Sequence, residues 1–284
     1  MFSDVMNIVL NMIQIVILLF AAGFAIERLK RKKASVMLVF FIYGVICWLL
    51  SDIYWLAMDV MLPDKRIRFG VNEIAEAGVF LLFATLTTIV SRMVENKGAL
   101  ITQVLSLLYS VLIIGLWIAW NGEVAKDILS GIAFMVLICS CVNAMQVTGA
   151  LSKKQWAVLC ILSFTVCILQ YVIFVVPSGL AKVLDITCYI LMGINMLFVL
   201  VVSVRSAIAS KNEGNLSKSA PAFTLSVLCF IISTSNMYMS AEAVYPFSFA
   251  AVSLSIPLMV YTVLLVGDLE TGSIMQSKKQ GGIL

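Results

Sequence analysis

The chain has 284 residues, 62% of them hydrophobic and 12% charged, with a mean hydropathy of +1.07 and a net charge of +4. Soluble domains are about 45–50% apolar and about 25% charged, so a water-soluble fold cannot bury this much apolar surface. The composition therefore predicts a polytopic membrane protein without a nucleic-acid partner, and the absence of histidine excludes histidine-ligated metals and histidine general bases.

Nine continuous apolar stretches are long enough to cross the hydrocarbon core, which takes about 20 helical residues. Barrel strands would alternate apolar and polar residues over about ten positions, which these runs do not. They lie at roughly 5–27, 34–62, 69–91, 99–120, 127–149, 156–176, 182–205, 221–239 and 246–267. The sequence therefore predicts an all-α transmembrane bundle in a single integral membrane domain, 1–284. Eight spans is the alternative, because 221–239 ends in a polar run.

The 19 lysines and arginines predict the orientation, because cytoplasmic segments are enriched in these residues. With the N-terminus outside, 14 fall on cytoplasmic segments and 5 on outer segments. We therefore expect a cytoplasmic C-terminus, a flexible cytoplasmic loop at 206–220 and a short cytoplasmic tail at 268–284. Asp4 precedes the first apolar run and Arg28 follows it, which favours a retained helix over a cleaved signal peptide.

Acidic side chains within spans carry the strongest functional signal, because an ionisable group in a bilayer is costly and usually faces a partner or a wet cavity. Acids and aromatics recur at helical spacing over 48–59 and again over 69–83, so each set lies along one helix face. The predicted ligand-binding residues are Trp48, Asp52, Trp55, Asp59, Asn72, Glu73 and Glu76. We expect no catalytic residue, metal site or cofactor.

A tight outer turn at Pro63 joins these two helices, so Asp52 and Glu76 are expected to meet about 10–15 Å below the outer boundary. Carboxylates attract cations, and tryptophan faces attract organic ammonium groups. The sequence therefore predicts an outward-facing pocket for a small cationic or protonatable ligand. A structural latch, in which arginines of the turn pair with these acids, is the alternative.

The remaining polar residues within spans are interpreted as bonds between helices, the usual role of such groups in membranes. Tryptophans near span ends are interpreted as interfacial anchors. The residues concerned are Asn11, Gln14, Gln103, Asn143, Gln146, Gln170 and Asn195 for bonding, and Trp117, Trp120 and Trp156 for anchoring. Asp185 is a further acid near an outer helix end, and the sequence leaves open whether it joins the pocket.

The segments 48–52 and 72–83, separated by a turn with Pro63, resemble the membrane-embedded N-terminal sensory regions of some bacterial diguanylate cyclases and histidine kinases. The resemblance covers about residues 48–88. It implies a bacterial inner or plasma membrane protein with a sensory role. No cytoplasmic catalytic domain follows the last span, so the resemblance implies a free-standing sensor that signals through a separate partner protein.

Three functions remain open, since the fold class alone does not decide among them. The leading expectation is a sensor or receptor-like module that binds its ligand from outside. The alternative is a small proton- or cation-coupled secondary transporter, which also needs access from the cytoplasmic side. The third is an intramembrane lipid-modifying enzyme with two carboxylates as acid and base, and we favour a non-enzyme. The lipid bilayer is the remaining expected partner, and the oligomeric state is open.

Overall fold

The computed structural model describes residues 2–31, 35–61, 70–94, 99–121, 124–213, 215–239 and 245–281. These residues form nine α-helices and no strand. The helices are α1 (Phe2–Arg31), α2 (Val36–Met61), α3 (Val71–Met93), α4 (Leu100–Asn121), α5 (Val124–Val147), α6 (Lys153–Ile173), α7 (Ser178–Glu213), α8 (Leu216–Tyr238) and α9 (Tyr245–Gly281). Each contains a segment long and apolar enough to cross a membrane. The protein is an all-helical, multi-pass membrane bundle.

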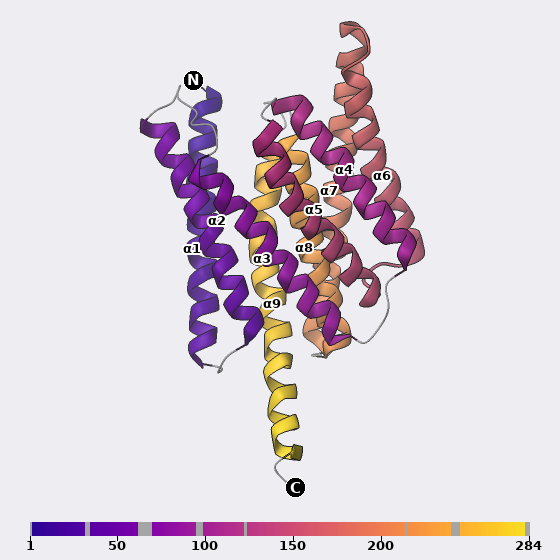
Figure 1. Ribbon diagram of the computed structural model, residues 1–284. Coiled ribbons are helices and arrows are strands. Elements are labelled where there is room, and N and C mark those ends of the chain that lie inside the picture. Colours follow the sequence, from indigo (N-terminus) through magenta and orange to yellow (C-terminus); the bar gives the residue numbers. More distant parts are fainter. Residues whose placement is uncertain are drawn as a thin grey trace.

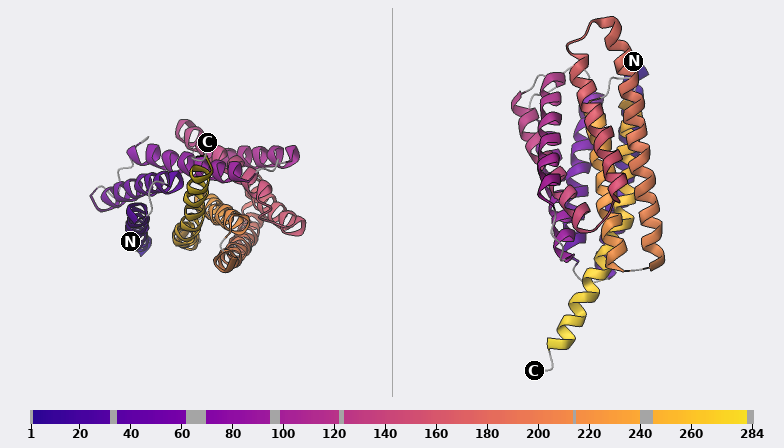
Figure 2. Two further views of the ribbon diagram at one scale, coloured as in Figure 1. Left: turned by 90° about the horizontal axis from the view of Figure 1, so that it is seen from below. Right: turned by 90° about the vertical axis from the view of Figure 1, so that its right-hand side faces the viewer.

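The helices pack in two rows (Figures 1 and 2). The first row is α2, α3, α5 and α4 in this order, and the second row is α1, α9, α8, α7 and α6. The rows meet at their ends, where α1 packs on α2 and α4 packs on α6. In the middle, α8 contacts α3 and α5 across the rows. The arrangement places residues from both rows around the same interior space.

Helix α8 is the central helix of the bundle. Of its most apolar window, 78% is buried inside the protein, against 28–50% for the other spans, and its hydropathy of 1.5 is the lowest. Because protein rather than lipid surrounds α8, this helix can carry buried hydroxyls: Ser226, for example, lies 3.0 Å from the Thr262 hydroxyl of α9. This burial explains why the apolarity of 221–239 is weak. The described residues support nine spans and not the eight-span alternative.

The longest helices differ most from expectation. Helix α7 continues to Glu213 and α8 begins at Leu216, so most of the segment expected as a flexible loop, 206–220, is helical. The two helix ends are held together, since the buried hydroxyls of Ser210 and Ser219 lie 2.8 Å apart. Helix α9 likewise continues to Gly281 through most of the expected tail, and it projects from the bundle at the end opposite the start of α1 (Figure 1).

Candidate ligand-binding site

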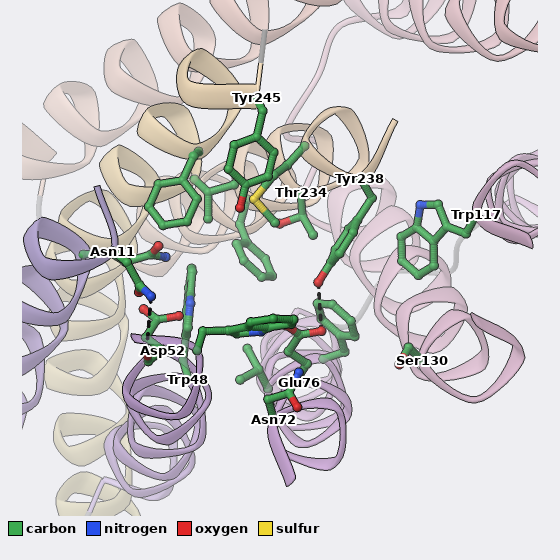
Figure 3. Close-up of a pocket in the computed structure, with 18 of the residues that line it drawn as sticks. Asn11, Trp48, Asp52, Asn72, Glu76, Trp117, Ser130, Thr234, Tyr238 and Tyr245 are labelled. Carbon is green, nitrogen blue, oxygen red and sulfur yellow. Dashed lines mark hydrogen bonds between the residues drawn. The ribbon is translucent and has the colours of Figure 1, made fainter. Parts of the chain in front are cut away.

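A cavity of about 480 Å³ lies between the two rows. Residues of α1, α2, α3, α4, α5, α8 and α9 line it, and most come from the turns nearest the end of the bundle where α1 begins. We call this end the cavity end and the opposite one the basic end. Figure 3 shows Asn11 on one side of the cavity, Trp117 and Ser130 on the other, and Tyr245 facing Trp48 and Glu76 between them.

Three aromatic rings form the inner boundary of the cavity. Trp48, Phe80 and Phe230 come from α2, α3 and α8, and we call them the aromatic floor. The ring centroids of Trp48 and Phe230 are 4.9 Å apart, and those of Phe80 and Phe230 are 6.2 Å apart. All three side chains are buried, so the floor closes the cavity toward the middle of the bundle.

A polar layer lies one helical turn closer to the cavity end. Asp52, Glu76 and Thr234 are each four residues from a floor ring on the same helix, which places them on the same face. Helices α2 and α8 run toward the cavity end and α3 runs away from it, so the three polar side chains lie at a similar level. The cavity therefore combines an apolar base with an acidic layer above it.

The two predicted acids of this layer differ in their surroundings. Glu76 Oε2 accepts a hydrogen bond of 2.8 Å from the Tyr238 hydroxyl of α8 (Figure 3). Asn11 donates to the main-chain carbonyl of Asp52 at 3.3 Å, but not to its carboxylate. Asp52 is only 7% exposed, and its Oδ2 atom has no hydrogen-bond partner. A buried acceptor without a donor is costly, so a ligand with a donor group would stabilise this side chain.

A third acid enters from α5. Asp127 lies in the first turn of that helix, is buried, and lines the cavity beside Ser130. Trp117 of α4 lies nearby in the lining, with its ring centroid 4.9 Å from that of Tyr238. Trp117 is 3% exposed and its Nε1 has no hydrogen-bond partner. The site therefore has carboxylates on α2, α3 and α5 with aromatic rings between them.

The structure brings five of the seven predicted site residues together. Around the cavity lie Trp48, Asp52, Trp55, Asn72 and Glu76. Glu73 is buried on α3 but is not among the lining residues. The side chain of Asp59 and the arginines of the proposed latch lie outside the described residues. The predicted grouping of Asp52 with Glu76 is therefore seen as geometry, and ligand binding by this group stays a prediction.

Several lining residues were not predicted as site residues. Trp117 was expected to be an interfacial anchor, and this is wrong because its side chain is buried against Tyr238 and Phe134. Asp127 falls at the first residue of its predicted span and so gave no signal of a membrane-buried acid. Asp185, which the sequence left open, lies on α7 and is not among the described lining residues.

Polar residues nearer the basic end pair between helices, as expected for bonds within a membrane bundle. Gln103 of α4 donates to Asn143 of α5 at 3.3 Å, and Thr87 of α3 donates to Ser140 of α5 at 2.8 Å. These pairs join neighbours of the first row. No protein-family model, curated protein or solved structure matches the chain.

Proposed function

We propose that the protein is a membrane sensor whose cavity binds a small organic cation from outside the cell. The observation that carries the proposal is the buried carboxylate of Asp52, whose Oδ2 lacks a hydrogen-bond donor beside the rings of Trp48 and Trp55. An ammonium group would donate to Asp52 and at the same time lie against a tryptophan face, which favours cations. The aromatic floor then holds the apolar part of the ligand.

The orientation assigned to the cavity rests on charge. Lysines and arginines of the described helices gather at the basic end, where the positive-inside tendency would put them in the cytoplasm. They include Arg28, Lys30, Arg31, Arg92, Lys153, Lys154, Arg205, Lys211 and Lys218, and the exceptions are Lys126 and Lys182, which lie in helical turns toward the cavity end. With this end inside, the cavity opens outward and the projecting part of α9 is cytoplasmic.

Helix α9 offers a route from ligand to signal. Tyr245 and Phe249, in its first turns, line the cavity, and the same helix continues to Gly281 beyond the bundle. Where α9 leaves the bundle, a Cβ atom on Gly267 would lie 3.0 Å from the Ser35 hydroxyl beside α2. Helices α2 and α9 thus both border the cavity at one end and approach closely at the other. A ligand that draws them together at the cavity would shift the projecting helix, which a partner protein reads.

Binding of n-butylammonium to purified protein in lipid nanodiscs, measured by calorimetry, tests the proposal. We expect saturable binding that Asp52→Asn abolishes while thermal stability is kept, because asparagine has nearly the same shape and Oδ2 of Asp52 has no hydrogen-bond partner to lose. Asp185→Asn is the matched control, since it removes a carboxylate from α7 outside the lining. If the wild-type protein bound no cation and D52N had a lower melting temperature, Asp52 would instead have a structural role.

Cation-coupled transport is the second candidate, favoured by the polar pairs Thr87–Ser140 and Gln103–Asn143 on the far side of the aromatic floor. A transporter would have to open that floor, whereas a sensor would not. Labelled butylammonium and sealed proteoliposomes separate the two. We expect binding without accumulation inside the vesicles, and D52N-sensitive accumulation would assign transport instead.

A further inference from the structure

The three carboxylates of the cavity come from helices that are neighbours in the first row. Asp52 is on α2, Glu76 on α3 and Asp127 on α5, and α3 packs against both of the other helices. Glu76 is therefore the middle member of the series. Among the described residues, no three of these acids lie close enough together to hold a metal ion, so the acids follow the order of their helices along one wall and do not form a single cluster.

The facing wall is uncharged. Among the described lining residues, those from α1, α8 and α9 are amides, hydroxyls, aromatics and aliphatic groups, and no lysine or arginine lines either wall. In the lining that the structure describes, the charged groups are therefore all acidic, and they attract positive charge. A single ammonium group can contact only part of this acidic wall, whereas a cation with several nitrogens can contact two or three of its carboxylates.

An aromatic surface lies beneath two of the acids. The aromatic floor lies one turn below the acidic layer, with Trp48 under the Asp52 position and Phe80 under the Glu76 position. A ligand that reaches from Asp52 to Glu76 passes over these rings. A methylene chain suits that path, because it gains from contact with aromatic surface and needs no hydrogen bond.

We propose that the ligand is a linear aliphatic polyamine, with at least two protonated nitrogens joined by methylene segments. This assignment rests on the proposed cation site and specifies its ligand class. One terminal ammonium donates to Asp52 Oδ2, a second nitrogen lies between Glu76 and Asp127, and the methylene chain lies over the aromatic floor. The hydroxyls of Thr234 and Ser130 are in the lining near these nitrogens and serve as additional acceptors.

Affinities of n-butylammonium, 1,4-diaminobutane and spermidine for the full-length protein in nanodiscs test this, at one fixed ionic strength because salt screens charge pairs. We expect the diamine to bind about tenfold more tightly than the monoamine, or better, and the triamine to bind more tightly again. Asp127→Asn should reduce this preference for additional nitrogens. Glu76→Gln should reduce it too, while the glutamine side-chain oxygen can still accept the hydrogen bond from the Tyr238 hydroxyl. Asp185→Asn, outside the lining, should keep the full preference.

The outcomes separate the two proposals. If butylammonium binds in a D52N-sensitive manner but the diamine binds no more tightly, the polyamine assignment is wrong and the cation site stands. If Asp127→Asn and Glu76→Gln both fold, bind butylammonium and keep the wild-type preference, the assignment is also overturned. If none of the three amines binds, the cation site fails and the polyamine assignment fails with it. Mg²⁺ serves as a dication without methylenes, and displacement of the diamine by equimolar Mg²⁺ would contradict the role of the aromatic floor.

Discussion

Tyr238 and Glu76 are 162 residues apart in the chain, and the hydroxyl of one donates to the carboxylate of the other at 2.8 Å. The bond joins the last turn of α8 to the second turn of α3, across the two rows. It holds Glu76 against one wall of the cavity, whereas Asp52 has no such donor on Oδ2. The two acids thus differ in their surroundings: a protein donor positions Glu76, whereas Asp52 Oδ2 has none.

Tyr238→Phe should separate stability from binding. Removing the hydroxyl costs about 1 kcal/mol of stability, the usual contribution of one hydrogen bond, and should lower the melting temperature in detergent. Glu76 then loses a competing donor, so affinity for butylammonium should stay the same or rise. Tyr43→Phe is the control, because Tyr43 is 59% exposed on α2. Equal melting temperatures for the two variants would contradict the structural role of the Tyr238 bond.

Gly44→Ala should weaken the packing beneath the aromatic floor. An added Cβ would lie 2.7 Å from Phe83 Cε1, and Phe83 is fixed by rings of Phe41 and Phe230 at 6.1 Å and 5.5 Å. Overpacking of this kind costs about 1–3 kcal/mol. The melting temperature and the affinity for amines should both fall, because Phe230 belongs to the aromatic floor.

The matched change for Gly44→Ala is Gly193→Ala on α7, where an added Cβ meets nothing within 4 Å. Alanine favours a helix over glycine by up to about 1 kcal/mol. The two substitutions should therefore move the melting temperature in opposite directions. If both substitutions shifted the melting temperature in the same direction, α2 and α3 would not approach each other as closely as they do in the structure.

The orientation proposed from charge predicts that the connection between α4 and α5 is outside and the end of α9 is in the cytoplasm. Reporter fusions at 122–123 and after residue 281, one type active only outside and one only inside, measure this directly. We expect opposite sides for the two positions. Fusions that report the same side at both positions would contradict the odd number of spans between them.

The sequence was informative where the physical cause is local. Continuous apolar runs predicted the spans, and the hairpin of α2 and α3 brought Asp52 near Glu76 because the two helices are consecutive. The remaining lining depends on which distant helices pack together, and no local pattern encodes that. Tyr238 was missed for this reason, and Asp127 because it stands at the very start of its predicted span. Helix α8 appeared weak because its hydrophobicity reflects burial in protein and not contact with lipid.

The lining of the cavity by both α1 and α9 has a consequence for biogenesis. Asn11 and Gln14 enter the membrane with the first helix, while Tyr245 and Phe249 arrive only with the ninth. A nascent chain that has inserted eight helices still lacks one wall of the cavity. Under the proposed function, the binding site is complete only after α9 has inserted, so chains truncated before α9 are expected not to bind butylammonium.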